Sequence, residues 1–207
     1  MRHLAVEAGI RQFLDIGTGI PLAGTADLIA RHAMPGTSTV YADNDPIVLA
    51  HAHALLRGQS DGAVAYVDGD LRDPGVILAR AADTLDLTRP AALVLGAVLQ
   101  LLGDDDDPHG VVAELVGALA PGSHLVISHL AADIAPDAMA AFALCLDRGA
   151  RETSVLRDHD EVSRFFAGLR LVAPGVVQVD QWRPRRARPL PLGAWVPAVY
   201  GGVGRRP

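Results

Sequence analysis

The chain has 207 residues, half of them hydrophobic, and a net charge of −6 from 24 acidic and 18 basic residues. This length predicts a single domain over residues 1–207, with room for a full core. No apolar run reaches the roughly 20 residues of a membrane span, and the acidic balance and few aromatic side chains argue against nucleic-acid binding. All 18 basic residues are Arg, which excludes reactions that need a lysine.

Three further features of composition bear on location and surface. The first residues lack the apolar stretch of a secretory signal, so a cytoplasmic protein is expected. Cys145 is the only cysteine, and its apolar surroundings in residues 139–146 predict a buried hydrophobic side chain rather than a nucleophile. The end of the chain is rich in Arg, which predicts a solvated tail or, alternatively, a patch for an anionic substrate. These residues are Arg183, Arg185, Arg186, Arg188, Arg205 and Arg206.

Apolar runs alternate with helical patterns along the chain. Strands are expected at 12–16, 39–42, 63–67, 91–96, 124–128, 169–179 and 195–203, and helices at 2–10, 26–33, 46–56, 108–119, 137–146 and 158–166. Asp-Pro pairs at 45–46, 73–74 and 107–108 predict three helix starts, because Asp caps a helix and Pro suits its first turn. The alternation predicts an α/β, Rossmann-like, doubly wound sheet that is mostly parallel. The last two strands have no helix between them and are expected to be antiparallel.

The stretch Asp15-x-Gly17-x-Gly19 follows the first strand and precedes a helical pattern. Strand, glycine turn and helix form the nucleotide-binding corner of a doubly wound sheet. Leu22 stands where a dinucleotide fold has its third glycine, and Asp15 would repel a pyrophosphate. Both features favour S-adenosylmethionine (SAM), which carries an ammonium group and no phosphate.

Two acids follow the next two strands. Asp43 comes at the end of the second strand, where a carboxylate can accept both hydroxyls of a ribose. The alternative is that it only helps to cap the next helix. Asp70 follows the third strand, placed to accept from an adenine amino group while Leu71 covers the ring, or else to serve as an ordinary loop carboxylate. The ribose role predicts that Asp43→Asn weakens SAM binding with little effect on folding.

His129 and the acids 104–107 are the other polar residues with a candidate role in catalysis or metal binding. His129 is expected at the tip of the fifth strand, as a general base or as a polar strand end that faces solvent. The acids 104–107 precede a helix, whose dipole favours them, and this explanation is preferred to a divalent-cation site. No metal site is predicted.

The successive motifs resemble those of class I SAM-dependent methyltransferases. More narrowly, residues 13–21, 41–51, 104–108 and 200–205 resemble a family of bacterial S-adenosyl methyltransferases that was formerly a domain of unknown function. The resemblance implies a seven-stranded sheet with a last antiparallel strand, and SAM as the cofactor. It places Thr18, Asn44, Gly96 and Ala97 among the cofactor-binding residues. Gln100 stands where the family often has His, so its amide is expected to orient the acceptor without titrating.

The resemblance implies methyl transfer, and the low aromatic content and acidic charge favour a small-molecule acceptor. Family members carry a further segment at the amino end that this sequence lacks, so a non-catalytic SAM-binding or interaction module is one alternative. An NAD-dependent oxidoreductase is the other. A homodimer is compatible with the sequence, but no stretch of the sequence identifies a partner surface.

Overall fold

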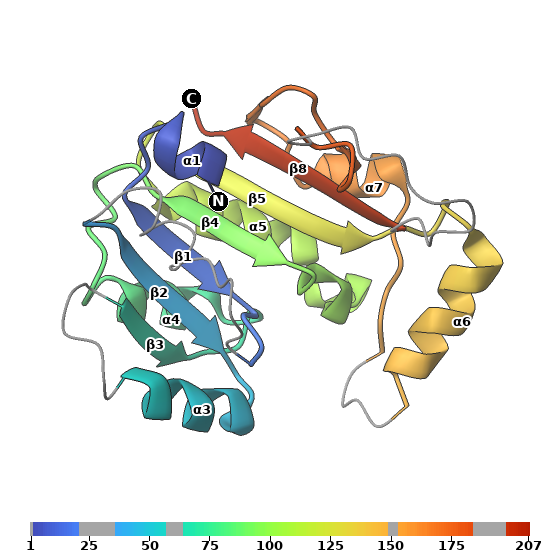
Figure 1. Cartoon of the computed structure of the whole chain (residues 1–207), viewed down its shortest axis with the longest axis horizontal. Helices are drawn as coiled ribbons and strands as arrows, with labels where there is room; N and C mark the ends of the chain where they lie inside the picture. The colour runs from blue at the N-terminus through green and yellow to red at the C-terminus, as the bar shows by residue number, and fades with distance from the viewer. Residues whose placement is uncertain (1, 21–35, 57–63, 149–152, 184–197) are drawn as a thin grey trace.

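The computed structural model of the chain describes residues 2–20, 36–56, 64–148, 153–183 and 198–207 (Figure 1). The helix expected at 26–33, and Leu22 with it, lie outside the described residues. The strands are β1 Gln12–Ile16, β2 Ser38–Asp43, β3 Val64–Asp68, β4 Ala92–Gly96, β5 His124–Leu130, β6 Arg170–Leu171, β7 Val177–Gln178 and β8 Val199–Arg205. The helices are α1 Arg2–Val6, α3 Pro46–Leu56, α4 Pro74–Ala81, α5 Pro108–Ala118, α6 Pro136–Leu146 and α7 His159–Arg164, with 3-10 turns η1 Leu99–Leu101 and η2 Asp104–Asp106.

The described strands form one sheet in the order β3-β2-β1-β4-β5-β8-β6, with β7 paired to β8 beside β6. The strands β1 to β5 are parallel, and β8 runs antiparallel to β5, β6 and β7. The doubly wound, mostly parallel sheet with late antiparallel strands is therefore confirmed. The expected count of seven strands is wrong, because the stretch 169–179 forms two short strands instead of one. Pro174 lies between them and has no N–H to donate to a strand ladder.

The three Asp-Pro helix starts are confirmed. Asp45 accepts a hydrogen bond from the backbone N–H of Ile47 at 2.8 Å at the start of α3. Asp73 and Asp107 cap α4 and α5 in the same manner. Each helix follows a strand or its loop, so these short local signals set the positions at which the chain turns back across the sheet.

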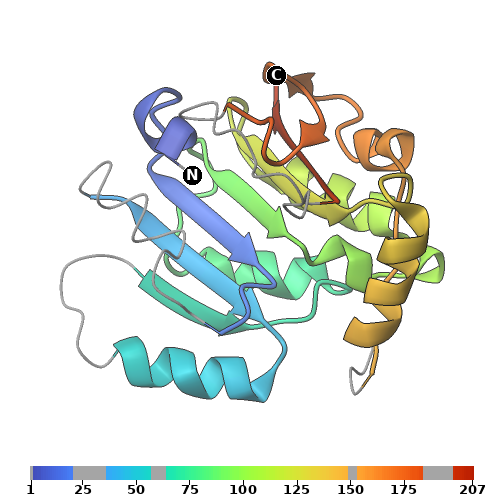
Figure 2. The same cartoon turned by 45° about the vertical axis from the view of Figure 1, so that its right-hand side comes forward.

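Side chains that alternate along the strands build a core on each face of the sheet. Leu14 lies in register with Val40 and Leu93, all three fully buried on the face that α4, α5 and α7 cover. Phe13 points to the opposite face and packs in a second cluster with Leu4 of α1. Figures 1 and 2 show α4 and α5 together on one side of the sheet and α1 on the other. The central strands are thus covered on both faces, as their apolar sequences predict.

Three expectations about single residues change. Cys145 is exposed, not buried, because α6 buries the face of Met139 and Ala143 and turns Cys145 to the other side. Arg183 and Arg206 are not simply solvated. Arg183 forms hydrogen bonds with His3 of α1 and with Glu7 just after it, and Arg206 donates to carbonyl oxygens at the end of α5. Within the described ranges, the helices are too short or too polar to cross a membrane.

Candidate functional site

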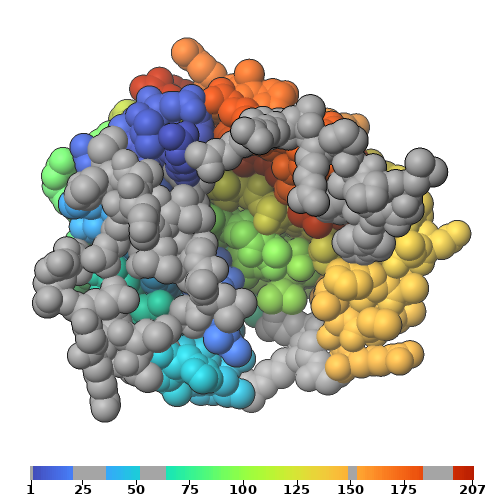
Figure 3. All heavy atoms as spheres, viewed as in Figure 1, coloured from blue at the N-terminus to red at the C-terminus, as the bar shows by residue number. Residues whose placement is uncertain are grey.

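A cavity of about 720 Å³ opens at the carboxyl ends of β1, β2, β3 and β4. Its walls come from the turns after these strands, at the edge where doubly wound sheets bind their ligands. Its volume is within the range of small-molecule sites. In Figure 3 the green atoms of the segment that follows β4 lie between α3 in cyan and α6 in yellow-orange. The described residues that line the cavity are Ile16, Gly17, Gly19, Asp43, Asn44, Asp45, Pro46, Ile47, Val48, Gly69, Asp70, Leu71, Arg72, Ala97, Val98, Leu101 and Leu102.

The turn after β1 presents bare backbone to this cavity. Gly17 and Gly19 have φ angles of 73° and 64°, which glycine adopts without steric cost. A Cβ on Gly17 would lie 2.3 Å from Cγ2 of Val98, so this residue packs closely against the segment after β4. A Cβ on Gly19 would meet no atom of the described residues within 4 Å. Gly19 therefore leaves open space through which a ligand can approach the backbone.

The carboxylate of Asp43 holds two turns together. Its Oδ2 accepts from the backbone N–H of Gly19 at 2.9 Å, and its Oδ1 accepts from the backbone N–H of Asp45 at 3.0 Å. Asp45 itself caps α3, so Asp43 is not needed for that task. Each carboxylate oxygen accepts at two lone-pair positions, which leaves Asp43 able to accept from a ligand as well.

Asp70 belongs to a chain of side-chain hydrogen bonds that joins Asn44, Asp70, Arg72 and Asp106. The amide of Asn44 donates to its Oδ2 at 3.0 Å, and the backbone N–H of Arg72 donates to its Oδ1 at 2.9 Å. Burial acts to raise the pKa of Asp70, but the hydrogen bonds from Arg72 and Asn44, together with the Arg72 charge, hold that pKa below its usual value. Asp70 is therefore an ionised acceptor in the cavity at neutral pH.

Arg72 is a cavity residue that the sequence did not point to. Its Nε donates to Oδ1 of Asp106 at 2.9 Å and its Nη2 to the carbonyl oxygen of Leu101 at 3.2 Å, so it ties the turn after β3 to η1 and η2. Asp106 also accepts from the backbone N–H of Gly103, and these bonds lower its pKa. The sequence shows only that an Arg stands two residues after Asp70. It does not identify Asp106 as the partner of Arg72, because the two residues are 34 positions apart.

Three of the four acids 104–107 have separate structural roles. Asp104 pairs with Arg157, Asp106 with Arg72, and Asp107 caps α5. No cluster of acids, His and Cys fit for a metal ion occurs in the described part of the chain. Asp107 thus serves the start of the helix as predicted, whereas Asp104 and Asp106 are held by arginines.

Arg157 is not a lining residue, but it holds η1, which forms part of the cavity wall, in place. It is 3% exposed, and its guanidinium donates to the carbonyl oxygens of Leu99 and Leu102, both at 3.0 Å. It thereby pins η1, whose residue Leu101 lines the cavity. Like Arg72, this residue was not identified from the sequence, because its partners lie more than 50 residues away.

The expected position of His129 is wrong. Strand β5 continues to Leu130, so His129 lies inside the strand, fully buried. Its Nδ1 is 2.9 Å from the carbonyl oxygen of Leu130, and its Nε2 is 3.0 Å from Nη1 of Arg157. Burial lowers the pKa of His129 to about 4, with a further contribution from the Arg157 charge. Both ring nitrogens are engaged, and the geometry contradicts both an accessible base and a solvent-facing strand end.

The site residues expected from the sequence fall into two groups. Gly17, Gly19, Asp43, Asn44, Asp70, Leu71 and Ala97 come together around the cavity. Asp15, Thr18, Gly96, Gln100 and His129 are not among its lining residues. Thr18 closes the glycine turn by donating to the backbone oxygen of Asp15 at 3.1 Å. Gln100 is 7% exposed, and within the described ranges its Oε1 lacks a hydrogen-bond partner.

Comparison with known proteins agrees with this geometry. The chain is similar to a protein of the DUF574 family from Streptomyces avermitilis, with 43% identity and a TM-score of 0.91 over 100% of this chain and 79% of that one. It is also similar to a putative methyltransferase from Thermobifida fusca, with 36% identity and a TM-score of 0.87 over 99% and 76% of the two chains. Among curated proteins, none matches this chain.

A more distant structure shares the fold alone. It is the N-methyltransferase NodS from Bradyrhizobium japonicum in complex with S-adenosyl-L-homocysteine (SAH), with 15% identity and a TM-score of 0.56 over 99% of this chain and 83% of that one. The family model described as S-adenosyl methyltransferase matches residues 1–207. The chain therefore belongs to the S-adenosyl methyltransferase family, and it is a SAM-dependent methyltransferase.

Proposed function

We propose that the cavity at the carboxyl edge of the sheet binds SAM and that the protein transfers its methyl group to a small molecule. In this proposal the turn at Gly17 and Gly19 holds the amino acid end, Asp43 the ribose, and Asp70 with Leu71 the adenine. SAM supplies an electrophilic methyl group on a sulfonium when bound. Asn44 supports Asp70 through the hydrogen bond already present between them.

The charge of the cavity is the observation that carries this proposal. Its described lining holds three carboxylates, those of Asp43, Asp45 and Asp70, against the one guanidinium of Arg72. A sulfonium and an ammonium suit such a lining, whereas the pyrophosphate of NAD would be repelled. The open backbone at Gly19 lies beside Asp43, at the edge where nucleotides bind to this fold.

The residues around the cavity favour positioning over proton transfer. Its described lining contains three acids, one Arg, one Asn, glycines and apolar side chains, but no His, Cys or Tyr. Alignment and exclusion of water can accelerate a displacement at a methyl group when the acceptor has already lost its proton. Gln100 is buried outside this lining, and its amide is given no contact with the acceptor in this proposal. His129 has no role as a base in this proposal.

Calorimetric titration with SAM and SAH tests the cofactor site, and NADH serves as the comparison ligand. Asp43→Asn should weaken SAM binding about tenfold to a hundredfold, because a hydrogen bond to a charged group is worth roughly 1.5–3 kcal/mol. Asp137→Asn on the exposed side of α6 is the matched control, since it changes the net charge equally. A folded wild-type protein that binds neither SAM nor SAH at millimolar concentration would refute the cofactor assignment.

The effect of Asp43→Asn on folding differs from what the sequence predicts. Both carboxylate oxygens accept backbone N–H groups, so an amide must turn its NH₂ toward Gly19 or Asp45. An unmade hydrogen bond of this kind costs roughly 1–3 kcal/mol, so the melting temperature should fall together with the affinity. Unchanged SAM affinity in the folded variant would mean that Asp43 only holds the turns.

The acceptor, location and assembly complete the proposal. A net charge of −6 and an aromatic content of 4% favour a small molecule over nucleic acid as acceptor. Transfer of a labelled methyl group from SAM into a cell extract, followed by sizing of the labelled product, tests this directly. We also propose that the chain is a single domain and that the protein is cytoplasmic. A homodimer is a further proposal, which light scattering tests.

A further inference from the structure

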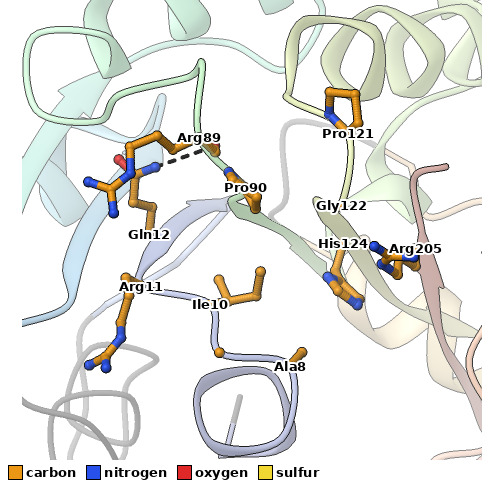
Figure 4. Close-up of a pocket in the computed structure, with 11 residues that line it drawn as sticks. Ala8, Ile10, Arg11, Gln12, Arg89, Pro90, Pro121, Gly122, His124 and Arg205 are labelled. Carbon is orange, nitrogen blue, oxygen red and sulfur yellow. Dashed lines mark hydrogen bonds between the residues drawn. The ribbon is translucent and has the colours of Figure 1, made fainter.

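A second cavity, of about 440 Å³, lies at the opposite edge of the sheet (Figure 4). It is formed at the amino ends of β1, β4 and β5 and the carboxyl end of β8. Gln12 begins β1 and lines this cavity, whereas Ile16 ends β1 and lines the other. At roughly 3.3 Å per residue these positions are about 13 Å apart. The two cavities are therefore separate sites.

The charges of the two cavities are opposite in sign. The described lining of the second cavity includes Arg11, Arg89 and Arg205 and no acidic side chain. In the described part of the chain, the guanidinium groups of Arg89 and Arg205 have neither an ion pair nor a hydrogen bond. In this protein of net charge −6, the side chain of Arg205 thus carries a positive charge at a concave surface whose described lining holds no acid. Such a surface attracts an anion.

His124 supplies a polar group inside this cavity. It is 5% exposed, and its Nδ1 has no hydrogen-bond partner among the described residues. In Figure 4 its ring lies beside the side chain of Arg205, while the side chains of Arg11 and Arg89, on the other side of the cavity, extend away from this pair. Burial lowers the pKa of His124, the charges of Arg205 and His3 add to this effect, and a hydrogen bond with the backbone of Gly122 opposes it. A buried polar atom without a partner is uncommon in folded proteins and indicates a missing ligand or water.

The rim of the cavity is held in place before any ligand binds. The side chain of Gln12 donates to the backbone oxygen of Asp86 at 2.9 Å and accepts from its N–H at 2.7 Å, which fixes the loop that carries Arg89. On the other side, Oγ of Ser123 accepts from the backbone N–H of Ala91 at 3.0 Å. A preformed rim avoids the entropy cost of ordering a loop on binding.

We propose that this cavity is a second ligand site, for a small organic phosphate. The phosphate lies between His124 and Arg205, where a guanidinium can donate two parallel hydrogen bonds to its oxygens. The organic part lies against the exposed side chain of Pro90, which a free phosphate ion would leave uncovered. This site is independent of the SAM site and of the methyl acceptor.

Titration with phenyl phosphate, inorganic phosphate and benzoate tests the proposal, by calorimetry and by NMR of the His124 ring. Phenyl phosphate should bind most tightly of the three and shift the His124 resonances. Arg205→Gln should weaken its binding about tenfold or more, as expected for loss of a charged hydrogen-bond donor. Arg164→Gln, on the surface of α7, is the control for net charge and should change the affinity less than twofold.

Three results would overturn the proposal. One is that none of the three probes binds the wild-type protein at millimolar concentration. Another is that Arg205→Gln and Arg164→Gln weaken phenyl phosphate binding equally, which would mean diffuse attraction to surface charge. The third is that saturating SAH displaces phenyl phosphate, which would place the probe in the other cavity. Tighter binding of benzoate than of phenyl phosphate would replace the phosphate by a carboxylate and refute the ligand class.

Discussion

Replacement of His129 by Gln tests the buried pair that supports η1. An arginine can only donate hydrogen bonds, so Nε2 of His129 must accept from Arg157 and its Nδ1–H must donate to Leu130. Protonation of Nε2 would remove that acceptor and place a second positive charge against the guanidinium. Gln offers an oxygen to Arg157 but does not titrate, so His129→Gln keeps the contact and removes its pH dependence.

The size of the effect follows from the pKa. His129 has a pKa of about 4 in the native protein, against 6.5 for the ordinary side chain. Between these values the unfolded chain binds a proton that the native protein does not, so stability falls as the pH falls. For a fully buried group with this shift, the loss between about pH 7 and about pH 5 is about 2 kcal/mol. His129→Gln should not show this part of the loss.

Urea unfolding of both proteins at a series of pH values measures the difference in slope. The comparison removes contributions from other groups, including His109 and His124, whose pKa values are also lowered. His159→Gln is the control, because the pKa of His159 is raised, chiefly by its hydrogen bond to Asp160. Its protonation stabilises the native state at low pH, so its removal cannot reduce the acid loss. Parallel curves for the wild type and His129→Gln would refute the argument.

Two further predictions concern the SAM cavity. Gly17→Ala should destabilise the fold by several kcal/mol, because its Cβ would overlap Val98 at a residue with positive φ. Gly19→Ala should cost only about 1 kcal/mol of stability and chiefly weaken SAM binding, because its Cβ would meet no described atom within 4 Å. Thermal unfolding and SAM titration of the two variants compare these effects, and equal loss of stability would contradict the assignment of Gly19 to the ligand side. Arg72→Gln should raise the pKa of Asp70 toward its usual value and weaken SAM binding about tenfold, which carboxyl NMR and calorimetry measure. The backbone N–H of residue 72 and the amide of Asn44 still donate to Asp70 in that variant, so its pKa should rise only part of the way. An unchanged value would show that the side chain of Arg72 does not contribute.

Local patterns in the sequence were sufficient for most of the fold. The Asp-Pro pairs, the apolar strands and the glycine turn each act over a few residues, so their structure could be predicted from neighbours alone. Because the carboxyl ends of parallel strands share one edge of the sheet, the same patterns also predicted that Gly19, Asp43 and Asp70 would approach one another. Their meeting around one cavity follows from the strand order β3-β2-β1-β4.

Contacts between distant segments were decided only by the tertiary structure. Arg72 meets Asp106 across 34 residues, and Arg157 meets His129 across 28, and nothing in the spacing of these residues identifies their partners. Cys145 was predicted to be buried because its helix is apolar on all sides, and only packing determines which face of such a helix is covered. The second cavity has the same origin, since His124 and Arg205 pair across β5 and β8 at opposite ends of a long stretch of chain. Local propensity acts between neighbours, whereas burial and charge act between whichever side chains the finished fold brings together.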